Sequence, residues 1–222
     1  MTLKISYSVN FKSAKFPSKK QLVGKYSILK PLNFKNHAGE LFKNFSLDKT
    51  NTLWTYMPYG PFKNLPSFKS YLKNNCLNKD PFFYAIYSKR LKSFCGVASY
   101  LRIKPAIGTI EVGWITYAPN LQRTVEATEA MYLMMKNVFE NLGYRRYEWK
   151  CDNLNQKSKK TAQRLGFIFE GVFRQATIYK KRNRDSAWFS IIDKEWKQCK
   201  IKFQSYLKRS NFNNELRECK KL

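Results

Sequence analysis

The chain has 222 residues, a formal net charge of +27 at pH 7, and 43% hydrophobic residues. That apolar content is ample for the core of one domain, so the composition excludes a wholly disordered chain. No apolar run approaches the roughly 20 residues of a membrane-spanning helix. The positive charge favours an acidic partner, such as nucleic acid, the ribosome, an anionic membrane surface or a phosphorylated ligand, although the lysines are scattered rather than clustered.

The cysteines and the histidine argue against metal chemistry. Five cysteines lie far apart without a CxxC pair, and His37 is the only histidine. A zinc site and a Cys–His catalytic pair are therefore not expected. Free thiols in a reducing compartment, the cytoplasm, are expected instead.

The first half of the chain alternates between strand-like and helix-like segments. Residues 1–21 are expected to form a basic, flexible N-terminal arm, 22–207 one domain and 208–222 a polar tail. Within the domain the pattern predicts a strand over Leu22–Leu32, a helix from Asn33 or Asn36 to Asn44, a helix over Pro66–Asn75, strands over Pro81–Tyr87 and Phe94–Ile103, and a strand over Gly108–Tyr117. Gly113, in the middle of the last strand, indicates a bulge or the close approach of another backbone. The aromatic loop Leu53–Phe62 either packs on the core as a lid or lines a pocket.

The second half continues with a helix over Leu121–Asn141 that Gly143 ends. Next come a strand over Tyr147–Asp152 and a helix over Asn155–Leu165. Two strands follow, over Phe167–Tyr179 and Ala187–Ile192, on either side of the charged turn Lys180–Asp185. The domain ends with a C-terminal amphipathic helix from Trp196. This order predicts an α/β (mixed α+β) fold, with a mixed sheet and helices on its faces. A ligand is expected beyond the carboxyl ends of the strands.

One junction of strand, turn and helix is suited to an anion. The strand Gly108–Tyr117 leads through a turn with Gln122 and Arg123 into the long helix. A helix N-terminus offers unpaired N–H groups and a partial positive charge. We expect this junction to hold an anionic group.

Two motifs at the correct separation resemble those of the GNAT acetyltransferase superfamily. The turn Gln122-Arg123-x-x-x-Ala127 resembles motif A, which reads Q/R-x-x-G-x-G/A. Asn155-x-x-Ser158, followed by Leu165-Gly166-Phe167 and Glu170-Gly171, resembles motif B. The resemblance covers roughly Leu22 to Trp196 and is greatest to the branch related to ribosomal-protein N-terminal acetyltransferases. It implies a GNAT-like fold of one domain, whose central sheet is mostly antiparallel.

The resemblance also implies that acetyl-CoA binds as co-substrate and that no metal is needed. Backbone groups of the motif A turn would hold the pyrophosphate, and Ile115 and Thr116 would bond the pantetheine arm where two strands splay apart. Asn155 would contact the same arm or fix its neighbouring loop, and Ser158 stands at the thiol. The cofactor-binding residues are thus Ile115, Thr116, Gln122, Arg123, Thr124, Val125, Glu126, Ala127, Asn155, Ser158, Lys159 and Lys160, the two lysines for the ribose 3′-phosphate.

Two positions depart from the family pattern. Val125 stands where the family usually has a glycine, which narrows the approach of the backbone to phosphate. Ala162 stands where a tyrosine acid is common, so Ser158 becomes the candidate acid or thiolate stabiliser, with Tyr132 and Tyr179 as alternatives.

Attack on a thioester needs a neutral amine and therefore a base. Without a suitable histidine, a carboxylate is expected to act directly or through water. Glu111 matches an acidic position of the branch and is the first candidate, and Glu148 is the second. Gly113 and the N–H of Ile115 are where polarisation of the thioester carbonyl is expected.

The sequence therefore predicts an acetyl-CoA-dependent N-acetyltransferase that works by direct attack. Its acceptor is a protein N-terminus, a lysine or a small molecule, and the basic surface makes contact with a ribosome or an acidic protein plausible. Arg182 and Arg184 of the charged turn are candidates for shaping the acceptor cleft. Two alternatives remain open: an inactive acyl-CoA-binding protein, and a basic protein that binds nucleic acid or the ribosome.

Overall fold

The computed structural model describes residues 6–213 and 221–222. Its centre is one eight-stranded sheet in the order β1-β2-β3-β4-β5-β6-β8-β7. The strands are β1 (Leu22–Val23), β2 (Ser27–Pro31), β3 (Phe82–Ser88), β4 (Ser93–Lys104), β5 (Thr109–Tyr117), β6 (Arg146–Asp152), β7 (Ile168–Tyr179) and β8 (Arg182–Ile192). The described α-helices are α1 (Phe34–Phe45), α2 (Leu65–Asn75), α3 (Val125–Lys136), α4 (Gln156–Arg164) and α5 (Asp193–Tyr206).

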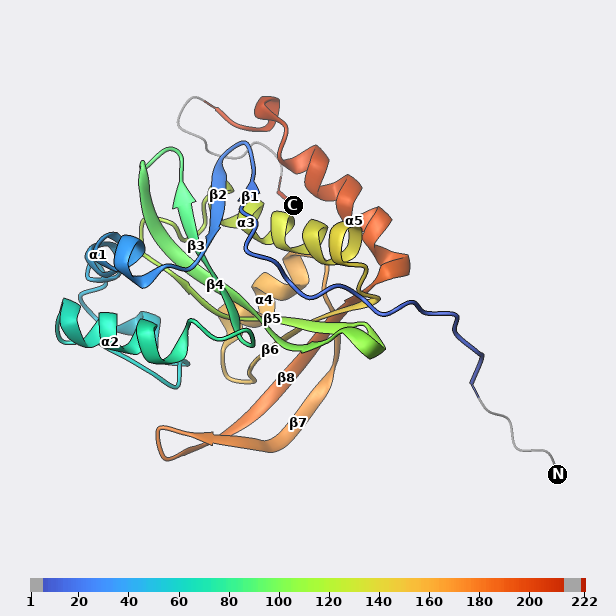
Figure 1. Cartoon of the computed structure of the whole chain (residues 1–222), viewed down its shortest axis with the longest axis horizontal. Coiled ribbons are helices and arrows are strands. Elements are labelled where there is room, and N and C mark those ends of the chain that lie inside the picture. The colour runs from blue at the N-terminus through green and yellow to red at the C-terminus, as the bar shows by residue number, and fades with distance from the viewer. Residues whose placement is uncertain (1–5, 214–220) are drawn as a thin grey trace.

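The predicted fold class is confirmed: a mixed sheet, mostly antiparallel, flanked by helices in a single domain (Figure 1). Within the described sheet only β5 and β6 are parallel neighbours, and α3 connects them. The other six neighbouring pairs are antiparallel. The parallel pair at the centre matters for function because ligands bind where the carboxyl ends of such strands diverge.

Polar caps set the helix starts. Asn33 caps α1 by accepting the N–H of Lys35 at 3.0 Å. Asn64 and Ser67 form a capping box at the start of α2. Thr124 caps α3 and Asn155 caps α4, each with one side-chain oxygen that accepts a backbone N–H of the first turn. Each cap satisfies N–H groups that the first helical turn leaves unpaired.

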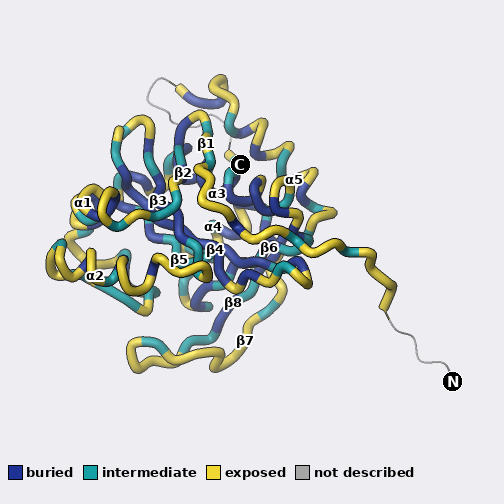
Figure 2. The backbone as a smooth tube through the Cα atoms, viewed as in Figure 1, coloured by how far each residue is buried: buried dark blue, intermediate teal, exposed yellow. Residues whose placement is uncertain are grey.

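The helices are fixed to the sheet through apolar packing and single buried hydrogen bonds. α1 is tied to β4 by the side chain of Asn44, which donates to the carbonyl of Phe94 at 3.0 Å. On α3, the carbonyl of Met134 accepts from the hydroxyl of Tyr100 at 2.8 Å. Figure 1 shows α1 and α2 together at one end and α5 alongside α3, where Tyr132 stacks on Trp196. Figure 2 shows the buried backbone concentrated in the central strands, while the β7–β8 hairpin projects with much of β7 exposed.

Three expected boundaries differ. The strand predicted over Leu22–Leu32 is two strands, because the chain turns at Gly24–Tyr26 around the carboxylate of Glu129. That carboxylate accepts three backbone N–H groups and the hydroxyl of Ser27, and a Cβ at Gly24 would collide with it.

The helix predicted from Leu121 begins at Val125. The residues before it form a turn, in which the N–H of Leu121 donates to the carbonyl of Ala118 and Arg123 has a left-handed φ of 59°. The predicted charged turn also shrinks to Lys180 and Lys181, whose φ angles of 48° and 59° suit a two-residue hairpin. The remaining residues of that segment, 182–185, belong to β8.

Parts of both chain ends pack on the domain. Of the predicted arm, Ala14 and Lys15 donate backbone hydrogen bonds to Pro105 and Leu142 at 3.1 and 2.8 Å. Residues 1–5 of the arm and 214–220 of the tail, with Cys219, lie outside the described residues. The four described cysteines are free. Among the described helices, none has both the length and the apolar character to cross a bilayer.

Candidate active site

β5 and β6 separate in the middle of the sheet. Their pairing ends at Val112 and Trp149, and no later residue of either strand pairs with the other. At the same point β5 carries a bulge: Ser99 opposes Gly113 and Val97 opposes Thr116, with Trp114 at φ 51°. Of the two alternatives predicted for Gly113, a bulge is present, and it follows the glycine at Trp114 and Ile115. The predicted pantetheine residues Ile115 and Thr116 lie on the separated part of β5.

The turn after β5 brings the motif A residues to the start of α3. Gln122 and Arg123 are exposed, and Gln122 Nε2 donates to the carbonyl of Tyr117 at 3.0 Å. Thr124 Oγ1 accepts the N–H of Ala127 at 3.2 Å and so caps the helix. The side chains of Gln122 and Arg123, with the N-terminal end of the helix, are thus available to an anion.

Two motif A side chains point into the protein instead. Val125 is buried in a small cluster with Tyr26, Tyr206 and Phe212. Glu126 is 1% exposed, and its Oε1 accepts from Arg90 Nε at 2.8 Å and from Ser88 Oγ at 3.1 Å. Only the backbone of these two residues can take part in phosphate binding. Arg90 also compensates the charge of Glu126, which would otherwise repel an anion nearby.

The motif B residues lie on α4 and differ in what they face. Asn155 Oδ1 accepts the N–H of Ser158 at 3.0 Å and caps the helix, which leaves its amide nitrogen for other contacts. Ser158 Oγ accepts from Trp149 Nε1 at 3.0 Å, so its own proton can point elsewhere. Asn155 and Ser158 line the cleft described below. Lys159 is held by Asn153 Oδ1 at 2.8 Å, and Lys160 is exposed.

A cleft of about 560 Å³ opens between the separated strands and the β7–β8 hairpin. Its walls come from the strands β4 to β8, from the start of α4 and from the aromatic loop at Tyr56–Pro58. That loop crosses the opening: Tyr56 Oη donates to the carbonyl of Leu154 at 3.2 Å, and Lys180 Nζ donates to that of Trp54 at 2.7 Å. The loop therefore both packs on the core and lines the pocket. The sequence had left these two roles as alternatives, and the structure shows both.

Glu111 is a buried carboxylate in the wall of this cleft, 3% exposed. Arg102 Nη1 and Lys150 Nζ contact the same oxygen, Oε2, at 2.6 and 2.9 Å. Among the described residues nothing bonds Oε1, which lies 3.5 Å from where a Cβ on Gly113 would stand. Burial raises the pKa of Glu111, and Arg102 and Lys150 offset only part of that rise. Glu111 thus has one held oxygen and one free oxygen.

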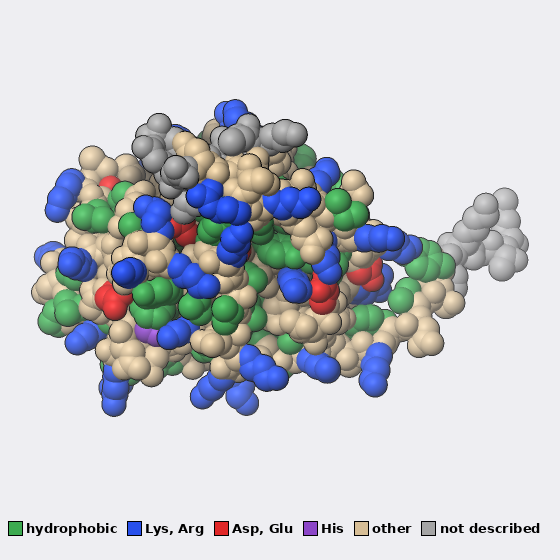
Figure 3. Space-filling view, turned by 90° about the horizontal axis from the view of Figure 1, so that it is seen from above, with side chains coloured by type: hydrophobic (Ala, Val, Ile, Leu, Met, Phe, Trp, Pro, Cys, Tyr) green, Lys and Arg blue, Asp and Glu red, His purple; other side chains and the backbone are tan. Residues whose placement is uncertain are grey.

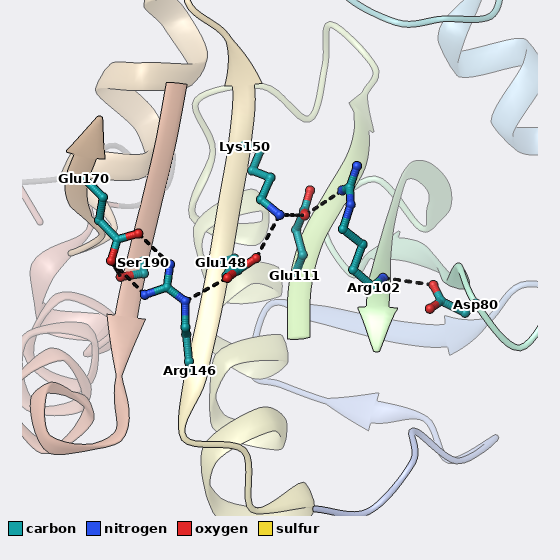
Figure 4. A network of polar contacts seen from close by, with 8 residues as sticks. All are labelled: Asp80, Arg102, Glu111, Arg146, Glu148, Lys150, Glu170 and Ser190. Carbon is teal, nitrogen blue, oxygen red and sulfur yellow. Dashed lines mark hydrogen bonds and ion pairs between the residues drawn. The ribbon is translucent and has the colours of Figure 1, made fainter. Parts of the chain in front are cut away.

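Glu111 belongs to a chain of charges across the sheet, in which it lies between Arg102 and Lys150 (Figure 4). Lys150 also contacts Glu148 at 2.9 Å, and Arg146 joins Glu148 to Glu170 at 2.7 and 2.5 Å. Burial acts to raise the pKa of Glu148, but hydrogen bonds from Arg146 and Lys150 outweigh it, so the pKa is lowered. Glu148 is outside the cleft lining and is the weaker base of the two candidates.

The two tyrosine alternatives are separated. Tyr132 packs between α3 and α5, against Trp196 and Phe203, away from the cleft. Tyr179 lines the cleft and donates to Asp152 Oδ2 at 2.8 Å. Burial and this hydrogen bond raise the pKa of Tyr179 to about 12. A hydroxyl so bonded is a poor proton donor.

Sequence reasoning missed three side chains of the cleft. Lys150, Arg102 and Trp188 come from three different strands. Lys150 gave a signal, because it alternates with the apolar residues of β6 and so shares a face with Glu148. The others depend on strand register and left no local pattern.

Comparison with known proteins decides the family. Residues 28–168 match the model of the acetyltransferase (GNAT) domain. This match covers more than half of the chain. The chain belongs to the GNAT acetyltransferase family. A crystal structure of a GCN5-related N-acetyltransferase from Brucella melitensis is 39% identical, with a TM-score of 0.93 over 96% of both chains.

Other GNAT proteins are less similar. A GNAT-family acetyltransferase structure from Chromobacterium violaceum is 36% identical, with a TM-score of 0.80 over 89% of this chain and 98% of that one. The uncharacterized N-acetyltransferase YnaD of Bacillus subtilis is 26% identical over 88 residues, 40% of this chain and 51% of YnaD. The match thus spans about half the length of that curated relative.

Two further GNAT structures were solved with a cofactor. The self-immunity acetyltransferase MccE, in complex with acetyl-CoA and AMP, is 25% identical over 76% of this chain and 93% of that one, with a TM-score of 0.66. The ribosomal-protein acetyltransferase RimL, in complex with coenzyme A, is 19% identical over 78% and 99% of the two chains, with a TM-score of 0.67. At that identity RimL shows the shared fold, and it places a ribosomal-protein acetyltransferase among the neighbours of this GNAT domain.

Proposed function

We propose that this GNAT domain transfers the acetyl group of acetyl-CoA to a primary amine by direct attack within a ternary complex. The observation that carries the proposal is the separation of β5 from β6 beyond Val112 and Trp149, with Glu111 buried in the cleft beside it. The acceptor is a protein N-terminus, a lysine or a small molecule. RimL, as a ribosomal-protein acetyltransferase of the same fold, supports a protein or ribosomal acceptor.

The donor half rests on backbone groups. The pantetheine arm adds to the free edge of β5 at Ile115 and Thr116 as an extra strand would. The pyrophosphate lies at the start of α3, with Gln122 and Arg123 beside it. The MccE and RimL complexes support acetyl-CoA as the co-substrate. Lys160, exposed on α4, is free to reach the 3′-phosphate, whereas Lys159 would first have to leave Asn153.

Glu111 is the general base of the proposal. Its free Oε1 faces the bulge next to Gly113, where the thioester carbonyl is expected. Because burial raises the pKa of Glu111, that pKa lies closer to the pKa of the acceptor amine, which favours proton transfer. Lys150 and Arg102 hold Oε2, so the carboxylate cannot turn away. Ser158 then stabilises the departing thiolate by donating its hydroxyl proton. That proton is not used by Trp149, because Trp149 Nε1 is the donor to Ser158 Oγ.

Two measurements test the function. Titration of acetyl-CoA into the protein is expected to show micromolar binding, and thiol release with a panel of amines is expected to show turnover. No binding at millimolar acetyl-CoA would contradict the proposal and favour a basic binding protein, whose cations are scattered over the face seen in Figure 3. Binding without transfer to any amine would instead favour an inactive acyl-CoA-binding protein.

A further inference from the structure

One wall of the cleft is a row of side chains on β8. Arg184, Ser186 and Trp188 alternate along the strand and all line the cleft, which puts them on one face. Trp188 is register partner to Lys150, whose ammonium lies 3.6 Å from the centre of its ring. The row therefore begins beside the ion pair of Glu111 and Lys150 and runs outward along the hairpin.

Two hydrogen-bond donors in this row have no acceptor. Arg184 Nε and Trp188 Nε1 are both buried, and neither finds a partner among the described residues. Arg184 also makes no ion pair within that part of the chain; its nearest notable contact is the ring of Tyr179 at 6.0 Å. A buried donor without a partner costs about 1–3 kcal/mol in general, so an acceptor supplied by a ligand would remove that cost.

The carboxylates in the cleft wall already accept from groups of the protein. Asp152 accepts from the N–H of Leu154 and from Tyr179 Oη, both at 2.8 Å. Oε2 of Glu111 is held by Arg102 and Lys150. What the wall offers a ligand, apart from the free oxygen of Glu111 and the hydroxyls of Thr177 and Ser186, is a cation and an indole N–H. Such a wall is complementary to an anion.

We propose that the acetyl acceptor is a primary amine that also carries a carboxylate or a phosphate: Arg184 binds the anion, while the amine faces Glu111 at the Trp188 end of the row. This inference rests on the proposed acetyl transfer. At a rise of roughly 3.3 Å per residue, Arg184 lies about 13 Å along β8 from Trp188. The anion and the amine are therefore separated by a distance on the order of 10 Å, the length of an extended tripeptide.

Three matched peptides test the proposal. Ala-Ala-Ala with a free carboxylate, the same peptide as its amide, and Ala-Ala-phosphoserine amide share an amine and differ in the distal anion. Wild-type protein is expected to acetylate one or both anionic peptides with a kcat/KM about tenfold or more above that of the neutral amide, the size of a charge-assisted hydrogen bond. The carboxylate and phosphate arms show which anion fits.

Arg184→Gln is expected to reduce this preference to about threefold or less, mainly through KM, and Arg184→Lys to keep part of it. Arg182→Gln is the matched control. It removes the same charge from the same strand at an exposed residue outside the cleft lining, and it is expected to keep the full preference.

Binding separates a failure of this inference from a failure of the proposed function. Each peptide is titrated into protein saturated with coenzyme A, which reports recognition without chemistry. Tighter binding of an anionic peptide that Arg184→Gln abolishes supports the proposal even if no acetyl group is transferred. Equal affinity for anionic and neutral peptides, including no measurable binding of either, overturns it. An effect of Arg182→Gln as large as that of Arg184→Gln also overturns it.

Discussion

In the proposed mechanism, the donor side and the acceptor side of the cleft are built from different parts of the chain. The donor side uses backbone groups, on β5 beyond Val112 and at the start of α3. The acceptor side uses side chains such as Glu111, Lys150 and Arg184, which come from separate strands. Backbone sites tolerate many side chains, whereas the acceptor side depends on individual residues. Substitutions should therefore affect chemistry most on the acceptor side and stability or cofactor affinity on the donor side.

The largest expected effect is on the acceptor side. Glu111→Gln removes the proposed base and should lower kcat by about 100-fold or more. Acetyl-CoA affinity should hardly change, because the donor side is left intact. Thiol release at saturating acetyl-CoA, with a parallel titration, measures both. Glu140→Gln is the control, since Glu140 bonds Trp196 and Lys200 away from the cleft and should keep its turnover. Unchanged turnover in Glu111→Gln would remove Glu111 from the mechanism.

On the donor side the largest expected effect is on stability. Glu129→Ala leaves the N–H groups of residues 25–27 without their acceptor. At about 1–3 kcal/mol for each buried group, the free energy of unfolding should fall by about 3 kcal/mol or more. Denaturant titration measures this loss, and Glu129→Gln, which keeps one acceptor oxygen, should lose less. A loss below about 1 kcal/mol for Glu129→Ala would show that water replaces the carboxylate.

Much of the donor side could be predicted because its signals are local. The turn, the cap and the helix start lie within Gln122–Ala127, and Asn155 and Ser158 share one turn of α4. Glu111 was named from its position in a family branch, but its partners were not. Arg102 reaches it from β4 and Lys150 from β6, and such contacts follow only from the register between distant strands. Arg184 was named as a candidate for the acceptor cleft, but it was assigned to a turn rather than to β8, because two left-handed lysines shorten that turn in a way the composition does not reveal.

Val125 tests the departure from the family pattern. Its side chain packs with Tyr26, Tyr206 and Phe212 rather than facing the phosphate site. Val125→Gly should therefore cost about 2 kcal/mol of stability through lost apolar burial, with no weakening of acetyl-CoA binding. Denaturation and titration measure the two effects. Acetyl-CoA binding that tightens by about tenfold would show that the valine obstructs the cofactor after all.

The smallest expected effect is at the outer end of the charge chain. The hydrogen bonds from Arg146 lower the pKa of Glu170, so its pairing stabilises the fold above the usual Glu range and is lost as the pH falls through the lowered pKa. Because the Glu170 side chain is 37% exposed, screening limits the effect. Glu170→Gln should cost less than about 1 kcal/mol at pH 7, and the difference from wild type should narrow below about pH 4. A difference that widens in acid would contradict this assignment.

The pH dependence of kcat/KM in wild type and Glu111→Gln tests the central claim most directly. A weakly basic acceptor such as a hydrazide keeps protonation of the amine from hiding the enzyme's own titration. Because burial raises the pKa of Glu111, the wild-type rate should fall on the acid side as the pH drops through a value above the ordinary 4.5 of a glutamate. The variant should be slow and lack that acid limb. An acid limb of the same position and slope in Glu111→Gln would contradict the account and require another base.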